Sequence, residues 1–381
     1  MKLNHIYKSI ACGVLLAMTA TSCDLDYNPV DTYSDVTEGV NKTDEKPIFN
    51  SVQDVETSMV TLHKKFRDQQ EHWYVDKLLI GDAHSDNAYA GTTGAEVVPY
   101  ETNSIEGSNS VLKRDWDRFL GDIAVANRII VGCDQLKALS ESERGKYQSQ
   151  AKIFRAMVMF DMVRLWGNFP VITTVGGDIT EDNVEEMYPT YFPPQNTAEE
   201  AYAQIEKDLT EAVENPNTPT NDTSDKSILT KSVARAMLAK VYAEKPLRDY
   251  AKVIKYADEL AADGFDLVED FSDLWAYDTE KKDCRVRNTK EAILEAHFPP
   301  GSGNWCTWMF GRNLSNWDES FTWAKWITPS RDLIRLYEEQ GDTKRYNESV
   351  VWYDCGWSNY YPADHYAFMY KSVSYTHLRA H

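Results

Sequence analysis

The sequence has few basic residues for its size. Its 381 residues include 40 Lys and Arg against 60 Asp and Glu, which gives a formal net charge of −20. A surface this negative repels phosphate backbones and anionic lipid headgroups. The charge therefore disfavours nucleic acid as a partner and electrostatic docking on a membrane, and it favours a neutral polymer as the ligand.

Signature motifs of the common enzyme classes are also missing. The sequence contains no GxSxG, HExxH, P-loop or GxGxxG pattern, and its eight His are scattered. Among 60 acidic residues, pairs such as Glu185–Glu186 arise by chance and do not indicate a glycosidase. No CxxC pair suggests zinc, and a loop His beside an Asp, as at His84 and Asp86, is typical of plain surface. We expect no catalytic residue, no metal and no cofactor.

Cysteine is sparse, and two of the six Cys fall in the first 23 residues. The other four are Cys133, Cys284, Cys306 and Cys355. An oxidising cell envelope permits disulfides without requiring them, so every pairing among these four stays open. Cys133 lies within a helical pattern and is expected to be a buried thiol.

The N-terminus predicts the compartment. Residues 1–22 begin with Lys2 and Lys8 and continue with an apolar run too short to span a bilayer. Small residues and then Cys23 follow, an order typical of a bacterial lipoprotein signal. Several acyl chains on Cys23 would give a stable anchor in outer-membrane lipid. The alternative is an ordinary secretory signal with an incidental Cys. The polar residues 23–50 predict a tether.

Helical periodicity dominates the body of the chain. It predicts helices over 52–66, 112–131, 148–166, 198–214, 229–245, 249–263 and 330–340. Gly167 is expected to stop the third helix, and Pro170 cannot continue it. Two helices joined by a short turn across 229–263 have the dimension of a tetratricopeptide-like unit, which must stack on others to bury its apolar face.

The helical periodicity of the sequence is interrupted after Gly264, and its composition changes. We expect a helical scaffold over 51–264 and a loop-rich lobe over 265–372. Within the lobe, EAILEAHF (291–298) alternates like a short strand, and residues 299–328 are rich in Gly, Asn, Ser and Trp, which is typical of loops.

Five segments together resemble the SusD/RagB family of Bacteroidetes outer-membrane lipoproteins. They are SCDLDYNP at the lipidated Cys, AKIFRAMVMFDMVRLWGNFPVI (151–172), AEEAYAQIEKDLTEAV (198–213), LTKSVARAMLAKVYAE (229–244) and TPSRDLIRLYEEQGDTKRY (328–346). The resemblance implies an all-α fold, with tetratricopeptide-like hairpins as a scaffold and an irregular lobe that carries the ligand site. It also implies an exterior-facing protein that binds a glycan or another nutrient, performs no chemistry and sits on a SusC-like TonB-dependent transporter.

The end of the chain departs from that family. Members usually continue well beyond this length, and VSYTHLRAH (373–381) looks like translated vector or adapter sequence. We expect the last part of the lobe and scaffold to be missing. The other readings of the whole chain are a surface glycosidase and a tetratricopeptide-type scaffold that binds peptides, although the latter does not explain the lipid anchor or the Trp cluster.

The strongest candidate site is rich in Trp. Seven of the 11 Trp lie after residue 300, and five of those fall between Trp305 and Trp326. Sugars bind on flat aromatic faces, while polar side chains read their hydroxyls. The candidate ligand-binding residues here are Trp305, Trp308, Arg312, Asn313, Trp317 and Trp323. The alternative is that these Trp fill the core of the lobe.

Two further segments have a suitable composition. In residues 71–91, Trp73 would stack on a sugar, and Asp86, Asn87 and Tyr89 would bind hydroxyl groups. The alternative is that Asp86 and Asn87 form a turn. The third segment is GWSNYY (356–361).

Overall fold

The computed structural model describes residues 47–91, 95–177, 181, 183–244, 246–274, 277–278, 280, 283–298, 327–353 and 366–369. The chain divides by its internal contacts into Met1–Pro47 and Ile48–His381. Every helix and strand described here belongs to the second unit.

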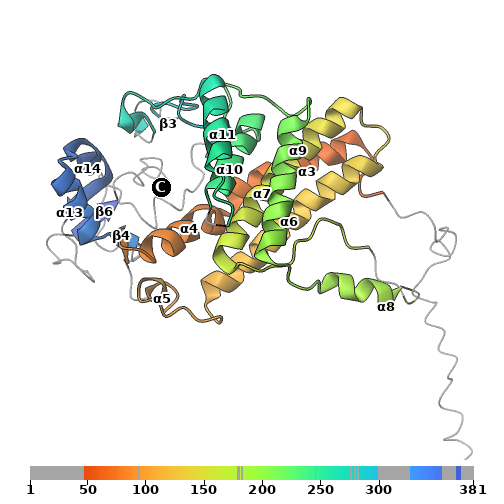
Figure 1. The fold of residues 1–381 in the computed structure, drawn as a ribbon, viewed down its shortest axis with the longest axis horizontal. Coiled ribbons are helices and arrows are strands. Elements are labelled where there is room, and N and C mark those ends of the chain that lie inside the picture. Colours follow the sequence, from red (N-terminus) through yellow and green to blue (C-terminus); the bar gives the residue numbers. More distant parts are fainter. Residues whose placement is uncertain are drawn as a thin grey trace, which may run out of the picture. The chain divides into compact units, whose positions relative to one another are not determined.

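Six helices pack side by side to form the scaffold, in the order α3, α6, α7, α9, α10, α11 (Figure 1). Their bounds are α3 (Val52–Asp68), α6 (Ser110–Gln135), α7 (Glu141–Trp166), α9 (Ala198–Glu214), α10 (Lys231–Ala243) and α11 (Tyr250–Ala262). Short turns join α6 to α7 and α10 to α11, so these pairs form helical hairpins. The structure is mostly helical, which confirms the all-α, tetratricopeptide-like scaffold.

Local sequence signals fix the ends of these helices. Three helices begin with a capping box, in which two side chains satisfy the first free N–H groups reciprocally. The pairs are Ser51–Asp54, Ser140–Glu143 and Thr197–Glu200. As predicted, α7 ends at Gly167, whose φ of 72° suits glycine.

A continuous apolar core runs between the scaffold helices, and the ion pair of Arg155 with Asp208 is buried within it. The guanidinium of Arg155 on α7 donates to both carboxylate oxygens of Asp208 on α9, at 2.8 and 2.7 Å. Arg155 also donates to Asn127 Oδ1 at 2.7 Å. The two charged side chains are 4% and 1% exposed. A buried pair with this bidentate geometry compensates for its own desolvation.

A second, smaller core lies beside the scaffold. It is built from Val75, Leu79, Ala83, Ala88, Ala90, Val97, Tyr100, Val111 and Ile327. Strand β1 (Ala88–Ala90) pairs with β4 (Ile327–Pro329), with Ala88 opposite Pro329 and Ala90 opposite Ile327. The short helix α5 (Val98–Glu101) covers this core. The second core thus joins the N-terminal part of the unit to its C-terminal part.

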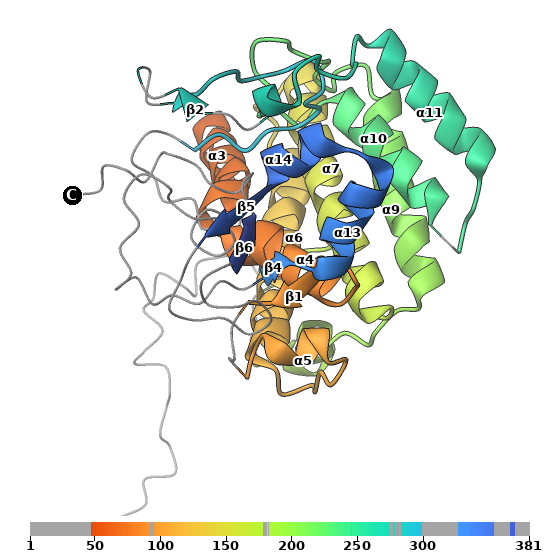
Figure 2. The ribbon, with the colours of Figure 1, turned by 90° about the vertical axis from the view of Figure 1, so that its left-hand side faces the viewer.

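The remaining elements are short. Figure 2 shows α13 (Arg331–Gln340), α14 (Thr343–Ser349), β5 and β6 grouped next to β4. β5 (Val350–Tyr353) pairs antiparallel with β6 (Tyr366–Met369), and β2 (Tyr277–Asp278) pairs with β3 (Asp283–Cys284). α8 (Val184–Met187) lies between α7 and α9 in the sequence. Among the described helices, none is both long and apolar enough to cross a bilayer.

Two sequence expectations were wrong. Residues 291–298 form no strand, although one was predicted there from the sequence. The backbone N–H groups of Val268 and Asn288 bond to the carboxylates of Glu291 and Glu295 at 3.0 and 3.2 Å, so this segment acts as a partner for loops and not for another strand. Helix α7 begins at Glu141, seven residues before the predicted start.

The expectation for Cys133 was correct. Its thiol is fully buried in the core and forms no disulfide. Burial raises the pKa of this thiol to about 12, so it stays protonated and unreactive.

Candidate functional site

Residues 71–83 form an irregular helix directly after α3. Two π-helical turns, Glu71–Val75 and Leu79–Ala83, flank α4 (Asp76–Leu78). π-helical turns are rare and are often found at functional sites. Here, buried polar contacts to α6 hold the segment in place.

The first group of contacts centres on the fully buried carboxylate of Asp122. Its Oδ2 lies 2.8 Å from His72 Nε2 and accepts a hydrogen bond from Trp73 Nε1 at 3.2 Å. Lys65 Nζ lies 3.2 Å from the other oxygen. A carboxylate with three such partners is compensated for its desolvation. Asp122 therefore fixes the first π-helical turn against α6.

Trp73, predicted to stack on a sugar, is instead a core residue. It is 3% exposed, and its ring centroid lies 4.7 Å from that of Phe66 and 5.5 Å from that of Phe154. Lys77 Nζ lies 4.9 Å from the ring centroid. A ring covered in this way has no surface for a ligand, which corrects the stacking role predicted for it.

The second group of contacts joins acidic and basic side chains one turn further along. Asp76 pairs with Arg114, and Glu71 pairs with Arg118 at 2.7 Å. Asp115 lies beside Asp76 and is also buried. Burial, followed by the negative charge and hydrogen bond of Asp76, raises the pKa of Asp115 to about 9. The buried pair of Asp76 and Asp115 therefore holds a proton at pH 7, and this proton lets the two carboxyl groups lie side by side.

Asp86, Asn87 and Tyr89 lie together where the irregular helix turns into β1. Asp86 and Asn87 are exposed in this turn, and Asn87 Nδ2 donates to Asp82 Oδ1 at 3.4 Å. The backbone of the turn binds the start of α13, because Ser330 donates to the carbonyls of Asp86 and Asn87. Tyr89 Oη accepts a hydrogen bond from the N–H of Arg331 at 3.2 Å. The turn thus presents two polar side chains on a fixed backbone.

The described residues that flank the Trp-rich segment both contact residues 71–91. Phe298 precedes that segment, and its ring centroid lies 6.4 Å from that of Tyr74. Ile327 follows it and pairs with Ala90 in the β1–β4 ladder. The fold therefore brings the ends of one candidate segment to the other candidate segment. No sequence pattern indicated these contacts.

The other candidate residues lie outside the described part of the chain. They are Trp305, Trp308, Arg312, Asn313, Trp317 and Trp323, together with Cys23 and residues 356–361.

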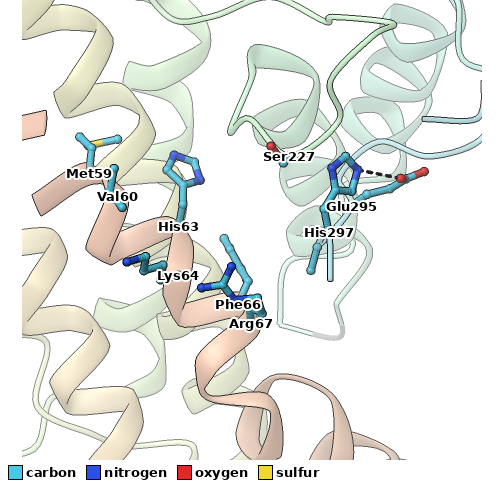
Figure 3. A pocket seen from close by; sticks show the side chains of 10 residues that line it. Met59, Val60, His63, Lys64, Phe66, Arg67, Ser227, Glu295 and His297 are labelled. Carbon is cyan, nitrogen blue, oxygen red and sulfur yellow. Dashed lines mark hydrogen bonds and ion pairs between the residues drawn. The ribbon is translucent and has the colours of Figure 1, made fainter. Parts of the chain in front are cut away.

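A pocket of about 380 Å³ opens between α3 and residues 295–297 (Figure 3). It is lined by Met59, Val60, His63, Lys64, Phe66, Arg67, Ser227, Glu295, Ala296 and His297. Figure 3 shows His297 and Glu295 on one side of the gap and the α3 side chains on the other. No sequence pattern indicated this pocket, because more than two hundred residues separate α3 from residues 295–297.

The described part of the chain offers groups that can bind a ligand. Its His, Cys, Asp and Glu side chains form no group of three or more that suits a metal ion. Burial lowers the pKa of His63 on the pocket wall, so its imidazole is neutral at pH 7. Its Nε2 lies 3.3 Å from Gln150 Oε1. The pocket offers charge, hydrogen bonds and apolar surface to a ligand.

Comparisons with known proteins agree with this architecture. A SusD-like protein of Bacteroides ovatus is 25% identical over 309 residues, which cover 78% of this chain and 50% of that protein. The chain thus spans about half the length of this curated relative. A solved laminarin-binding SusD-like protein is 20% identical, with a TM-score of 0.63 over 85% of this chain and 73% of that one. Surface glycan-binding protein A of Bacteroides thetaiotaomicron, solved with laminarihexaose, is 15% identical, with a TM-score of 0.65 over 85% and 71%.

The identities to the solved structures are low, so these structures establish the fold alone. The sequence match to a family is more direct, because it spans more than half of the chain and includes scaffold helices α3 to α10. That family is described as starch-binding and associating with the outer membrane, and it matches residues 32–243. The chain therefore belongs to the SusD-like family.

Proposed function

We propose that this chain is a cell-surface glycan-binding lipoprotein that delivers oligosaccharide to a SusC-like TonB-dependent outer-membrane transporter. The observation that carries the proposal is the family match over residues 32–243, whose description names starch binding and the outer membrane. The presence of laminarihexaose and a xylogluco-oligosaccharide in similar solved structures supports a glycan as the ligand class.

The fold also supports the position of the ligand site. Phe298 and Ile327 flank the Trp-rich segment and contact residues 71–91. Asp86 and Asn87 are exposed in that segment, on a turn whose backbone is fixed by Ser330. A sugar bound there would find hydroxyl partners at the turn and stacking partners among the Trp.

The test of the site measures affinity and stability together. Trp305, Trp308, Trp317 and Trp323 are each changed to Ala, and the affinity for laminarihexaose and the thermal midpoint are recorded. A stacked Trp at the centre of a site acts as a hot spot, so its loss should cost about 2 kcal/mol, or roughly thirtyfold in affinity, with the midpoint nearly unchanged. If all four variants melt early and the remaining folded protein binds normally, the Trp cluster is core and the site assignment is wrong.

The same preparation tests for catalysis. We expect binding without turnover, so incubation with laminarihexaose and xylogluco-oligosaccharide should yield no new reducing ends. Products that disappear when one carboxylate is mutated would place the chain among the glycosidases.

Membrane anchoring has a separate test. The signal-like residues 1–22 and the Cys that follows support acylation of Cys23. Cys23→Ala should move the protein from the detergent phase to the aqueous phase, whereas Cys12→Ala should not. Retention of Cys23→Ala in the membrane fraction would contradict the lipid anchor.

A further inference from the structure

The pocket between α3 and residues 295–297 carries positive charge on a protein whose formal net charge is −20. Two permanent cations, Lys64 and Arg67, line it from α3. Among the described residues that line it, the only carboxylate is that of Glu295. A basic concavity in an acidic surface concentrates anions locally, because nearby low-dielectric walls focus the field of its cations.

The two cations are not neutralised by strong ion pairs. Lys64 has no ion-pair partner within the described ranges, and it is exposed. Among the residues that the structure describes, Arg67 pairs only with its sequence neighbour Asp68 at 2.9 Å, and these side chains are 33% and 54% exposed. Exposed pairs of this kind contribute about 0–1 kcal/mol, so this pair can open to admit a ligand.

Lys65 shows what a structural cation looks like on the same helix. It lies 3.2 Å from the buried carboxylate of Asp122 and is 18% exposed. A favourable interaction with the helix dipole accounts for basic residues in the last turn of α3. It does not account for the placement of Lys64 and Arg67 on the wall of a pocket.

Glu295 is already occupied on the opposite wall. Its Oε2 accepts the backbone N–H of Asn288 at 3.2 Å and lies 3.1 Å from His297 Nε2 (Figure 3). These contacts hold the carboxylate on its own side of the pocket. The α3 cations therefore remain available for an acid group that enters from outside.

The rest of the lining is apolar. Met59, Phe66 and Ala296 supply carbon surface, and Val60 is 53% exposed on the helix. The C–H face of a sugar ring fits such a surface, and a ring carboxylate fits the adjacent cations. His63 is neutral at pH 7, so it acts toward a sugar as a hydrogen-bonding group.

We infer that this pocket binds the carboxylate of an acidic sugar, a uronate unit of the captured oligosaccharide, through Lys64 and Arg67. The inference rests on the proposed function, since it assumes that the ligand is a glycan. The net negative charge of the protein by itself favours a neutral glycan, and this inference adds one acidic sugar unit to that glycan. Guanidinium and ammonium groups form the strong, short hydrogen bonds that carboxylates require.

The ligand side of the test compares three probes on the full chain by calorimetry. They are an oligogalacturonate, its methyl ester and laminarihexaose. The ester keeps the shape of the sugar and removes its charge, so it should bind at least about tenfold more weakly than the acid. The affinity for the acid should also fall as salt is raised.

The protein side uses Lys64→Gln and Arg67→Gln, singly and together, with Lys137→Gln as the matched control. Lys137 is exposed, has no ion pair in the described ranges and does not line the pocket. The double variant should lose about tenfold or more in affinity for oligogalacturonate, and the control should lose none, although both lower the net charge. Thermal midpoints establish that each variant is folded.

The outcomes separate the two proposals. Binding of laminarihexaose with no binding of oligogalacturonate would overturn this inference and support the glycan-binding function. Equal affinity for the acid and its ester, or an equal loss in the double variant and in Lys137→Gln, would also overturn it. If none of the three probes nor the xylogluco-oligosaccharide binds, both proposals fail.

Discussion

Replacing Trp73 by Ala would separate a core role from a ligand role most directly. The side chain is 3% exposed, and it packs against Phe66 and Phe154 at ring-centroid distances of 4.7 and 5.5 Å. Removing a buried Trp in this way costs about 3–5 kcal/mol. For a chain of this length, such a loss lowers the thermal midpoint by roughly 4–6 °C. Glycan affinity of the protein that remains folded should be unchanged.

A milder substitution separates the contribution of ring packing to stability from that of the hydrogen bond to Asp122. Trp73→Phe keeps a ring between Phe66 and Phe154 and removes the N–H that donates to Asp122 at 3.2 Å. Because His72 and Lys65 still contact this carboxylate, the change should cost only about 1–2 kcal/mol.

Thermal unfolding followed by circular dichroism, with laminarihexaose titrations below the midpoint, provides the assay. Asn87→Ala serves as the surface control, because Asn87 is exposed in the candidate site. It should weaken binding with little change in the midpoint. A Trp73→Ala variant that melts within 1 °C of the wild type, a margin of about 1 kcal/mol or less, and loses glycan affinity would refute the core role.

Two further perturbations probe the buried charges. Asp115 has a folded pKa of about 9 against an ordinary 3.8, so the native state holds a proton that the unfolded state releases, and the contribution of this group to stability falls as pH rises between those values. In the wild type, this group lowers the free energy of unfolding by at most about 1.4 kcal/mol for each unit of rising pH, and Asp115→Asn should remove this pH dependence. The measurement is urea unfolding between pH 5 and 8. Equal pH dependence of the unfolding free energy in the two proteins would contradict the prediction. Arg155→Met leaves the charge of Asp208 buried without its counter-ion and should cost about 3–5 kcal/mol by urea unfolding. The double change Arg155→Met with Asp208→Leu should recover most of this, and a double variant as unstable as the single would argue against the ion pair as the cause.

Sequence alone predicted the scaffold well where two signals agreed. Helix α9 was predicted to span 198–214, and the structure gives the same bounds, because an apolar stripe lies between a capping box at Thr197 and a proline at 216. The start of α7 was missed because its first two turns are polar. The pair Ser140 and Glu143 was the available signal, a capping box that apolar periodicity cannot detect.

The candidate site was less predictable, because its residues meet through contacts between distant segments. Trp is a residue type that often binds sugars, so Trp73 was a reasonable candidate. Its burial became clear only from the rings of Phe66 on α3 and Phe154 on α7, which pack against it. The pocket joins Lys64 to His297 across most of the chain. At 291–298, the neighbouring Ile293 and Leu294 both pack on the core, while Glu291 and Glu295 bind loop N–H groups. A mixed apolar and acidic sequence is therefore not sufficient evidence for a paired strand.

The pairing of β1 with β4 also has a consequence for the order of folding. The contacts of α6 with α7 and of α10 with α11 are local, so these hairpins can form as soon as their residues are synthesised. Ala90 and Ile327 are more than two hundred residues apart, so β1 must wait for most of the chain before it finds its partner. Until then, β1 is an unpaired strand edge, and its length of three residues limits its capacity to recruit other chains. The hairpins can thus form early, and the pairing of β1 with β4 is completed last.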